Sequence, residues 1–238
     1  MTSEDPIDRD ASLELPEPAS EQDDVEVAHP GAAERAEGAE GGEGAGEPDG
    51  EEREPQELDP ETRARRDAAL RHVRKFGDPV LRAKALPVER FDEALEAEVA
   101  RMGELMQDAL GVGLAATQVG VLHRLLVYKA YVDDPLTALV NPVFEWMSEE
   151  LETGEEGCLS LPGVHVPVER HARVRVRALD GRGAPIEVEA EGLEARVIQH
   201  EIDHLDGTLI LDRISREERK EAMRAMREAQ AQATADAV

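Results

Sequence analysis

Two histidines four residues apart are the strongest chemical signal in the chain, because His200 and His204 are the ends of a His-Glu-Ile-Asp-His sequence. Residues four apart on a helix lie one turn apart on the same face, so both imidazoles can reach one metal ion, with Glu201 beside them as a base. Leu193 and Val197 fall on that same face, so the histidines continue an apolar stripe. The pattern favours a metal site over the alternative of two surface histidines.

Cys158 is the natural candidate for a third metal ligand. A catalytic zinc-type site needs three protein ligands and one open position, and no third histidine or glutamate follows at the spacing usual in metalloproteases. Cys158 is the only cysteine in the chain, and it lies in the sequence Glu156-Gly157-Cys158-Leu159-Ser160. A lone cysteine is often a small buried core residue. A thiolate beside two imidazoles would instead complete a centre that polarises a carbonyl and lowers the pKa of bound water.

A third segment, Gly111-Val112-Gly113-Leu114-Ala115-Ala116-Thr117-Gln118, combines glycines with an amide side chain. It lacks the G-x-G-x-x-G spacing of dinucleotide-binding turns. Its two glycines allow a ligand to approach the backbone, and the Gln118 amide could donate to a developing oxyanion. Taken alone, the segment is more typical of a packing turn made of small residues than of a catalytic site.

Composition excludes several classes of protein. The 238 residues carry 54 acidic and 27 basic side chains, a formal net charge of −27, and residues 1–60 hold 21 of the acids, 3 of the bases and no aromatic residue. Such a segment buries too little apolar surface to offset its ordering entropy. No apolar run is long enough to span a membrane, and the acidic N-terminus lacks the pattern of a secretory or transit signal. A single cysteine is typical of a protein from a reducing compartment. An acidic chain with 3% aromatic residues is also a poor nucleic-acid binder.

The elements that must position these residues can be read from periodicity and turn signals. We expect ordered structure to begin near residues 68–75, after an acidic disordered extension over 1–65. The patterns predict helices over 91–110, 193–205 and 215–233, the last with a capping box between Ser215 and Glu218. They predict strands over 121–130, 137–144, 173–179, 186–189 and 208–214. The expected fold is α+β, with antiparallel β-sheets packed around a central metal-binding helix and a C-terminal helix and tail over 215–238.

Together, and in this order, the three motifs make the chain resemble bacterial peptide deformylases. The family's G-x-G-L-A-A-x-Q appears at 111–118, its E-G-C-L-S at 156–160 and its Q-H-E-x-D-H at 199–204. The likeness runs from about Leu70 to Ile214, so the catalytic domain is expected over 66–214. Two features depart from the family pattern: the acidic N-terminal extension, and residues 107–110, which directly precede the glycine motif. The second difference concerns the loop over the substrate cleft and not the metal ligands.

The resemblance implies a hydrolase that removes the formyl group from the N-terminal formylmethionine of newly synthesised polypeptides. It implies that Cys158, His200 and His204 bind one divalent metal ion, with Fe²⁺ expected and Zn²⁺, Ni²⁺ or Co²⁺ able to substitute. Glu201 would take a proton from the attacking water and return it to the leaving amine. The Gln118 side chain and the Leu159 backbone N–H would stabilise the oxyanion.

Substrate contacts and partners follow as further expectations. Gly113 would hold the substrate backbone in an extended pose, and Val112, Leu193 and Val197 are the candidates for the methionine pocket. The expected partners are N-formylmethionyl nascent peptides and no membrane or specific nucleic-acid sequence, with a cytoplasmic monomer as the expected state. Six basic residues over 213–227 suggest a C-terminal helix that docks on the ribosome, although an ordinary salt-bridged solvent helix fits them equally well.

Two other functions remain open on these residues. A general H-E-x-x-H endopeptidase would cleave internal peptide bonds, but it leaves Cys158 and the glycine motif unexplained. A non-catalytic protein could use its acidic tail to capture basic partners and its metal for structure. A closed structural site would need a fourth protein ligand, whereas the motifs supply three ligands and a neighbouring glutamate.

Overall fold

The computed structural model describes residues 58–235, with side chains up to residue 228, so the predicted disorder of the acidic extension falls largely outside the described part. In chain order the elements are α1 (Pro60–Leu70), η1 (Pro79–Arg82), α2 (Glu93–Asp108), β1 (Gly113–Ala115), η2 (Ala116–Val119), β2 (Leu125–Tyr128), β3 (Thr137–Met147), β4 (Leu151–Cys158), β5 (Leu161–His171), β6 (Arg173–Leu179), β7 (Pro185–Glu191), α3 (Gly192–Leu205), η3 (Ile210–Asp212) and α4 (Arg216–Ala235). The η elements are short 3₁₀-helices.

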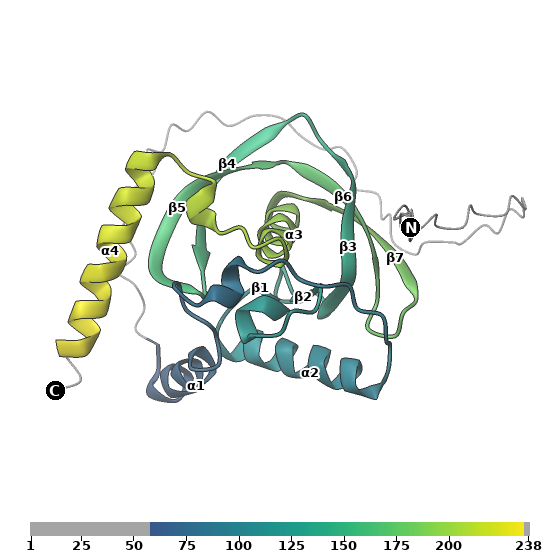
Figure 1. The fold of residues 1–238 in the computed structure, drawn as a ribbon, viewed down its shortest axis with the longest axis horizontal. Helices are drawn as coiled ribbons and strands as arrows, with labels where there is room; N and C mark the ends of the chain where they lie inside the picture. The colour runs from purple at the N-terminus through teal and green to yellow at the C-terminus, as the bar shows by residue number, and fades with distance from the viewer. Residues whose placement is uncertain (1–57, 236–238) are drawn as a thin grey trace, which may run out of the picture. The chain divides into compact units, whose positions relative to one another are not determined.

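Two antiparallel sheets surround one helix, as predicted. A five-stranded sheet has the order β1-β2-β3-β6-β7, and β4 pairs with β5 in a separate two-stranded sheet. Helix α3 lies between these strands, while α2 lies below β1 and β2 and α4 lies beside β5 (Figure 1). The α+β architecture with a central helix and a C-terminal helix is confirmed.

The core forms where α3 meets the five-stranded sheet. Val197, Ile198 and Ile202 of α3 are buried together with sheet residues such as Leu126 and Val176. Burying each large aliphatic side chain contributes about 1.5–3 kcal/mol, so this contact fixes the position of the helix. The helix face that carries the predicted ligands is therefore held by the main core of the molecule.

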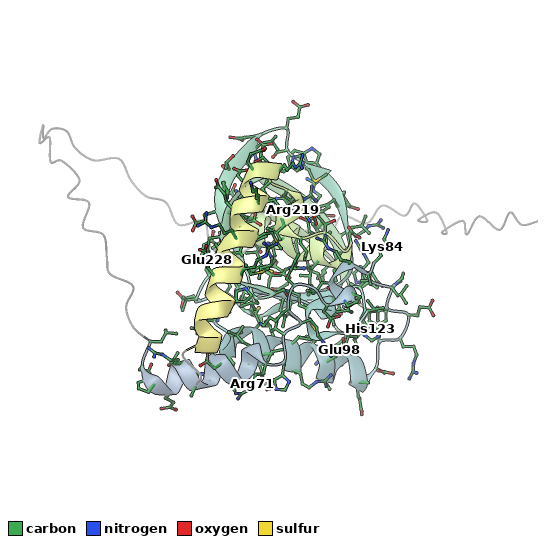
Figure 2. All side chains as sticks on the ribbon, turned by 60° about the vertical axis from the view of Figure 1, so that its left-hand side comes forward. Arg71, Lys84, Glu98, His123, Arg219 and Glu228 are labelled. Carbon is green, nitrogen blue, oxygen red and sulfur yellow. The ribbon has the colours of Figure 1, made fainter. Side chains whose placement is uncertain are left out.

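A second group of apolar contacts attaches the C-terminal helix. Ala222 and Met226 of α4 are buried against Val164, Val166 and Val168 of β5. The predicted capping box is present at its start, because Glu218 N donates to Ser215 Oγ at 3.2 Å and Ser215 N donates to Glu218 Oε2 at 2.8 Å. Arg219 and Glu228 lie along this helix in Figure 2.

Most elements confirm the prediction, and one is wrong. The predicted helices at 91–110 and 193–205 appear as α2 and α3, and the predicted strands at 121–130, 137–144, 173–179 and 186–189 appear as β2, β3, β6 and β7. The strand expected over 208–214 is instead the 3₁₀-helix η3. Leu209 N donates to Asp212 Oδ2 at 2.9 Å, which closes a turn, and the adjacent Ile210 and Leu211 are both buried, so the side chains do not alternate between two faces.

Sequence patterns did not predict the helix α1 or the β4–β5 hairpin. Ordered structure begins earlier than the expected 68–75, because Asp59 caps α1 by accepting from Glu61 N and Thr62 N, and Pro60 occupies the first helical position. In the part of the chain described here, no helix is long and apolar enough to cross a membrane.

Candidate metal centre

Three side chains that the sequence analysis assigned as ligands converge from two elements. Cys158 is the last residue of β4, and His200 and His204 lie one turn apart on α3. One ligand atom of each lies within 4.8 Å of the others, and Cys158 Sγ lies 3.2 Å from His204 Nε2. The two imidazole rings are 5.0 Å apart between centroids.

The donor set fits a divalent transition metal. A thiolate and two imidazoles suit zinc, iron, nickel or cobalt better than they suit Mg²⁺ or Ca²⁺, which prefer oxygen. His200 Nδ1 lies 2.9 Å from Glu156 Oε2. This contact orients the imidazole ring and leaves its Nε2 free to coordinate a metal ion. Glu201 Oε2, on the next residue, is buried without a hydrogen-bond partner in the described part of the chain. A ligand at this position would supply the missing contact.

The electrostatics favour a charged thiolate. Burial raises the pKa of the Cys158 thiol, but the adjacent His204 and His200 outweigh burial and hold that pKa well below its ordinary value. Burial lowers the pKa of His200, but Cys158 and Glu156 together raise it well above its usual value. The thiolate form is the one that binds metals.

Glu201 is placed as a buried carboxyl group against Gly113. Burial raises the pKa of Glu201 above its ordinary range, with the imidazoles acting in the opposite direction. A Cβ at position 113 would overlap the Glu201 carboxylate, so only glycine leaves room for this side chain. These two residues have separate predicted roles, and the structure brings them into contact.

Gln118 points its amide toward the same centre. Its Oε1 accepts from Ala115 N at 2.9 Å, which fixes the orientation of the amide group. Its Nε2 donates to Ser160 Oγ at 3.3 Å and lies 3.7 Å from Cys158 Sγ. The amide nitrogen is thereby held next to the predicted ligands, where a developing oxyanion would accept from it in place of one of these partners.

Leu159 follows the cysteine and is held by a half-buried lysine. Lys75 Nζ donates to the Leu159 carbonyl at 3.0 Å. Burial lowers the pKa of Lys75, while the nearby Cys158 raises it and Arg66 lowers it further. The contact ties the segment after Cys158 to the turn at 76–79 and was not predicted.

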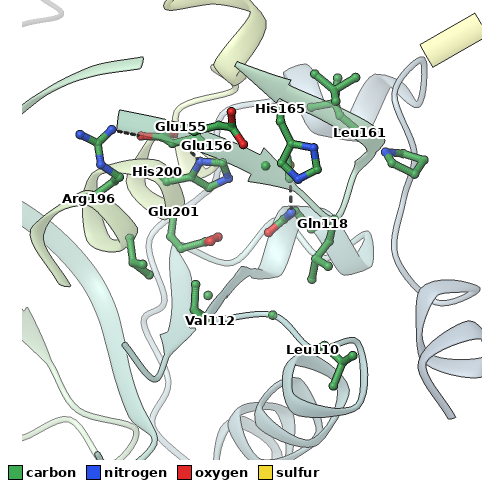
Figure 3. A pocket seen from close by; sticks show the side chains of 18 of the residues that line it. Leu110, Val112, Gln118, Glu155, Glu156, Leu161, His165, Arg196, His200 and Glu201 are labelled. Atoms are coloured by element: carbon green, nitrogen blue, oxygen red, sulfur yellow. Dashed lines mark hydrogen bonds and ion pairs between the residues drawn. The ribbon is translucent and has the colours of Figure 1, made fainter. Parts of the chain in front are cut away.

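A cavity of ≈ 330 Å³ opens beside the three ligands, and the four predicted substrate residues line it (Figure 3). Val112 and Leu193 are 45% and 42% exposed at its mouth, whereas Val197 is buried. Gly113 lies on β1, the edge strand of the five-stranded sheet, so one backbone edge of β1 is unpaired within that sheet. Leu159 and Glu201 also line the cavity.

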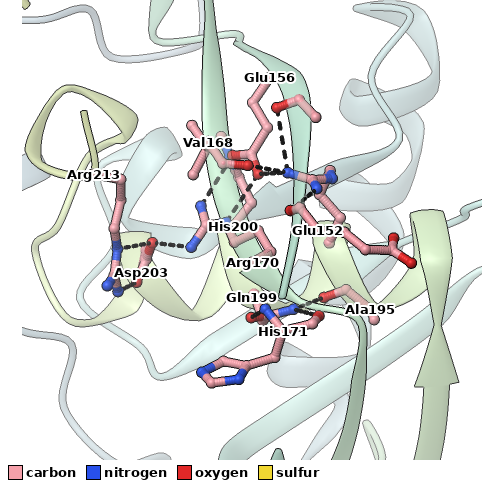
Figure 4. A network of polar contacts seen from close by, with 12 residues as sticks. Glu152, Glu156, Val168, Arg170, His171, Ala195, Gln199, His200, Asp203 and Arg213 are labelled. Carbon is pink, nitrogen blue, oxygen red and sulfur yellow. Dashed lines mark hydrogen bonds and ion pairs between the residues drawn. The ribbon is translucent and has the colours of Figure 1, made fainter. Parts of the chain in front are cut away.

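A network of charged side chains supports His200, one of the predicted ligands, through Glu156 (Figure 4). Arg170 Nε donates to Glu156 Oε1 at 2.9 Å, and Arg196 Nη1 donates to the same oxygen at 2.9 Å. Arg170 Nη1 also donates to Asp203 Oδ2 at 2.6 Å, and Arg213 pairs with Asp203 from the other side. Burial raises the pKa of Glu156, but Arg170 and His200 outweigh burial and lower it to about 2.

This network was not predicted from the sequence. Glu156 was quoted within a motif but was given no role, and Arg170 and Arg196 lie outside all three motifs. Glu156 and Arg170 are 14 residues apart, on strands whose pairing was not predicted. Predicting these contacts from the sequence would have required knowing how the strands of the β4–β5 hairpin pair.

Comparisons with known proteins agree on one family. Residues 70–220 match the family model described as polypeptide deformylase. A peptide deformylase from Acidothermus cellulolyticus is 50% identical over 162 residues, covering 68% of this chain and 88% of the relative. One from Thermotoga neapolitana is 52% identical over 142 residues, covering 60% of this chain and 85% of the relative.

Solved structures give the same result. The crystal structure of a peptide deformylase from Legionella pneumophila aligns with a TM-score of 0.65 and 40% identity, covering 68% of this chain and 96% of that one. A peptide deformylase from Synechococcus elongatus in complex with actinonin aligns with a TM-score of 0.62 and 43% identity, covering 63% and 84% of the two chains.

Proposed function

Because the chain belongs to the polypeptide deformylase family, we propose that Cys158, His200 and His204 hold the divalent metal ion of a deformylase site. The protein is a metal-dependent hydrolase that removes the formyl group from the N-terminal formylmethionine of newly synthesised polypeptides. The observation that carries the site assignment is the convergence of three ligand atoms within 4.8 Å, beside a buried carboxylate without a partner.

The physiological ion is proposed to be Fe²⁺, with Zn²⁺, Ni²⁺ or Co²⁺ as functional substitutes. One soft thiolate and two imidazoles are compatible with each of these ions. When bound, such an ion supplies a Lewis acid that polarises the formyl carbonyl and makes water acidic enough to lose a proton near neutral pH. Glu156 assists by holding His200 in the orientation and tautomer that a ligand needs.

Glu201 is the proposed proton carrier. Its raised pKa suits a group that accepts a proton from the attacking water and then delivers it to the leaving amine. The Gln118 Nε2–H and the Leu159 backbone N–H are the proposed donors to the oxyanion that develops on the formyl oxygen. A carboxyl group buried against Gly113 has little freedom to leave this position.

The substrate is proposed to lie extended along β1. Gly113 offers an unpaired strand edge to the peptide backbone, so the peptide adds to the sheet as a short strand. Val112, Leu193 and Val197 form the proposed pocket for the methionine side chain, with Val197 at its buried end. An unbranched thioether fits such an apolar pocket without leaving a polar atom unpaired.

The remaining proposals concern the setting of the enzyme. We propose a cytoplasmic monomer whose C-terminal helix α4 docks on the ribosome. The apolar side of α4 is occupied by β5, so docking would use the outer side, where Arg216, Lys220 and Arg227 are exposed. Deleting residues 215–238 should reduce co-sedimentation with ribosomes, and unchanged co-sedimentation would contradict docking.

Formate release from formyl-Met-Ala-Ser tests the proposed site directly. The protein would be purified anaerobically with Fe²⁺ or Ni²⁺ and compared with Glu201→Gln, which keeps the shape of the side chain. We expect kcat to fall about 10²–10⁴-fold in the variant, with the metal content unchanged. Equal rates in both proteins would contradict the role of Glu201. Cleavage of an N-acetylated peptide at internal bonds would indicate an endopeptidase.

A further inference from the structure

Helix α1 supplies part of the cavity wall, although all of it except its last residue, Leu70, precedes the family match. Residues 70–220 match the polypeptide deformylase model, and α1 spans Pro60–Leu70. Arg66 and Leu70, one turn apart on α1, nevertheless line the cavity that contains Cys158 and Glu201. Of these two residues, Arg66 therefore lies outside the family match.

Contacts with α2 hold α1 in place. Ala69 is buried, and Arg65 Nε of α1 lies 3.4 Å from Asp108 Oδ1 of α2. Asp59 caps the start of the helix. The two neighbouring arginines are thus directed differently, with Arg65 toward α2 and Arg66 toward the cavity.

Arg66 is the cavity arginine whose charge is available to a ligand. The cavity is lined by two arginines, Arg66 and Arg196, and Arg196 is engaged by Glu156 at 2.9 Å. Arg66 is half-buried and makes no salt bridge with any residue in the described range 58–235. The apolar side chains of Leu70, Leu110 and Pro162 line the same cavity, and apolar surroundings strengthen a charge pair relative to bulk water.

We propose that Arg66 is a specificity-determining residue that favours substrates with a side-chain carboxylate downstream of the formylmethionine. A guanidinium group pairs with a carboxylate through two parallel hydrogen bonds, which a neutral amide cannot match. A nascent chain presents such carboxylates only on Asp and Glu side chains. This inference rests on the proposed function, because it requires the peptide to leave the metal site through this cavity.

The test is a series of C-terminally amidated formyl-Met peptides in which the second, third or fourth residue is Asp or its neutral isostere Asn. At the peptide position whose side chain reaches Arg66, kcat/KM should be about threefold higher for Asp than for Asn. A ratio of this order is what a partly exposed ion pair contributes. Arg66→Gln should bring that ratio to about one, and added salt should reduce it in the wild type.

Arg63→Gln is the matched control, because it removes the same charge from an exposed position of the same helix that does not line the cavity. It should leave the Asp/Asn ratio unchanged. Equal ratios in wild type and Arg66→Gln at all three positions would overturn the inference while formate release still supports deformylation. An effect seen only with a free terminal carboxylate would overturn the assignment to side chains. No formate from any peptide would overturn the proposed function and this inference together.

Discussion

At the scale of single residues, Gly113 is the position where a small change should have a large effect. A methyl group there would overlap the Glu201 carboxylate, so Gly113→Ala should displace the proposed proton carrier. A displacement of about 1 Å can cost about 10²-fold in rate, so we expect a loss of this order in kcat/KM with the metal retained.

Gly181→Ala is the control for that substitution. Its added Cβ would meet Val99 Cγ2 at 3.6 Å, an ordinary contact far from the cavity lining. If Gly113→Ala retained the activity of Gly181→Ala, the placement of Glu201 against Gly113 would be wrong.

Glu156 should matter through His200 and not through the substrate. Glu156→Gln removes the negative charge that orients His200 and that pairs with the buried Arg170 and the half-buried Arg196. Loss of such a supporting contact typically weakens metal affinity by about 10–100-fold, which competition with a chromophoric chelator would measure. Glu155→Gln, at the exposed neighbouring position, should leave the affinity unchanged. Equal affinities in both variants would contradict the supporting role.

At the scale of elements, the attachment of α4 rests on a few apolar side chains. Met226 is buried against β5, so Met226→Ala should lower the free energy of unfolding by about 2–3 kcal/mol in urea titrations. The same substitution at Met147, which is 41% exposed, should cost much less. Because none of the described side chains of α4, up to residue 228, lines the cavity, kcat should change little. Similar losses from both substitutions would argue against this packing.

A helix or strand could be predicted from the sequence where its own residues show a clear hydrophobic period. Helix α3 and strand β6 were predicted with nearly their observed bounds, because their apolar residues follow clear periods of 3.6 and two. Strand β4 was missed because its sequence, Leu-Glu-Thr-Gly-Glu-Glu-Gly-Cys, has low strand propensity and gains its conformation from pairing with β5.

The residues of the candidate site likewise fall into those that could be predicted from the sequence and those that could not. The residues in the three motifs could be named from the sequence because residue type and spacing carry the signal. Arg170 and Lys75 could not, because each acts through a contact between distant segments, such as Lys75 with the Leu159 carbonyl. Arg66 was missed for the same reason, since nothing in its neighbourhood of sequence indicates which side of α1 faces the cavity.

At the scale of the whole molecule, the buried network around Glu156 should make the free energy of unfolding depend on pH in the acidic range. The pKa of Glu156 is about 2 in the folded protein, below its ordinary value of 4.5. A group whose pKa is lowered by folding stabilises the native state above the unfolded pKa, and that contribution is lost as the pH falls toward the folded pKa. The metal-free protein should therefore lose stability between about pH 5 and pH 2.

Urea unfolding of the metal-free protein at several pH values would measure this dependence. Glu156→Gln should be less stable at pH 7 and should show a shallower decline below pH 5 than the wild type. Parallel declines in the two proteins would place the acid sensitivity elsewhere.

The separation of the ligands along the chain has a consequence for how the enzyme matures. Cys158 and His204 are 46 residues apart, on a hairpin and on the central helix. The helix alone offers two imidazoles, so a newly made chain cannot assemble all three ligands until the β4–β5 hairpin has docked. If these three side chains are the ligands, full coordination of the metal requires the hairpin to be packed against the helix, so metal binding and the docking of these two elements are coupled.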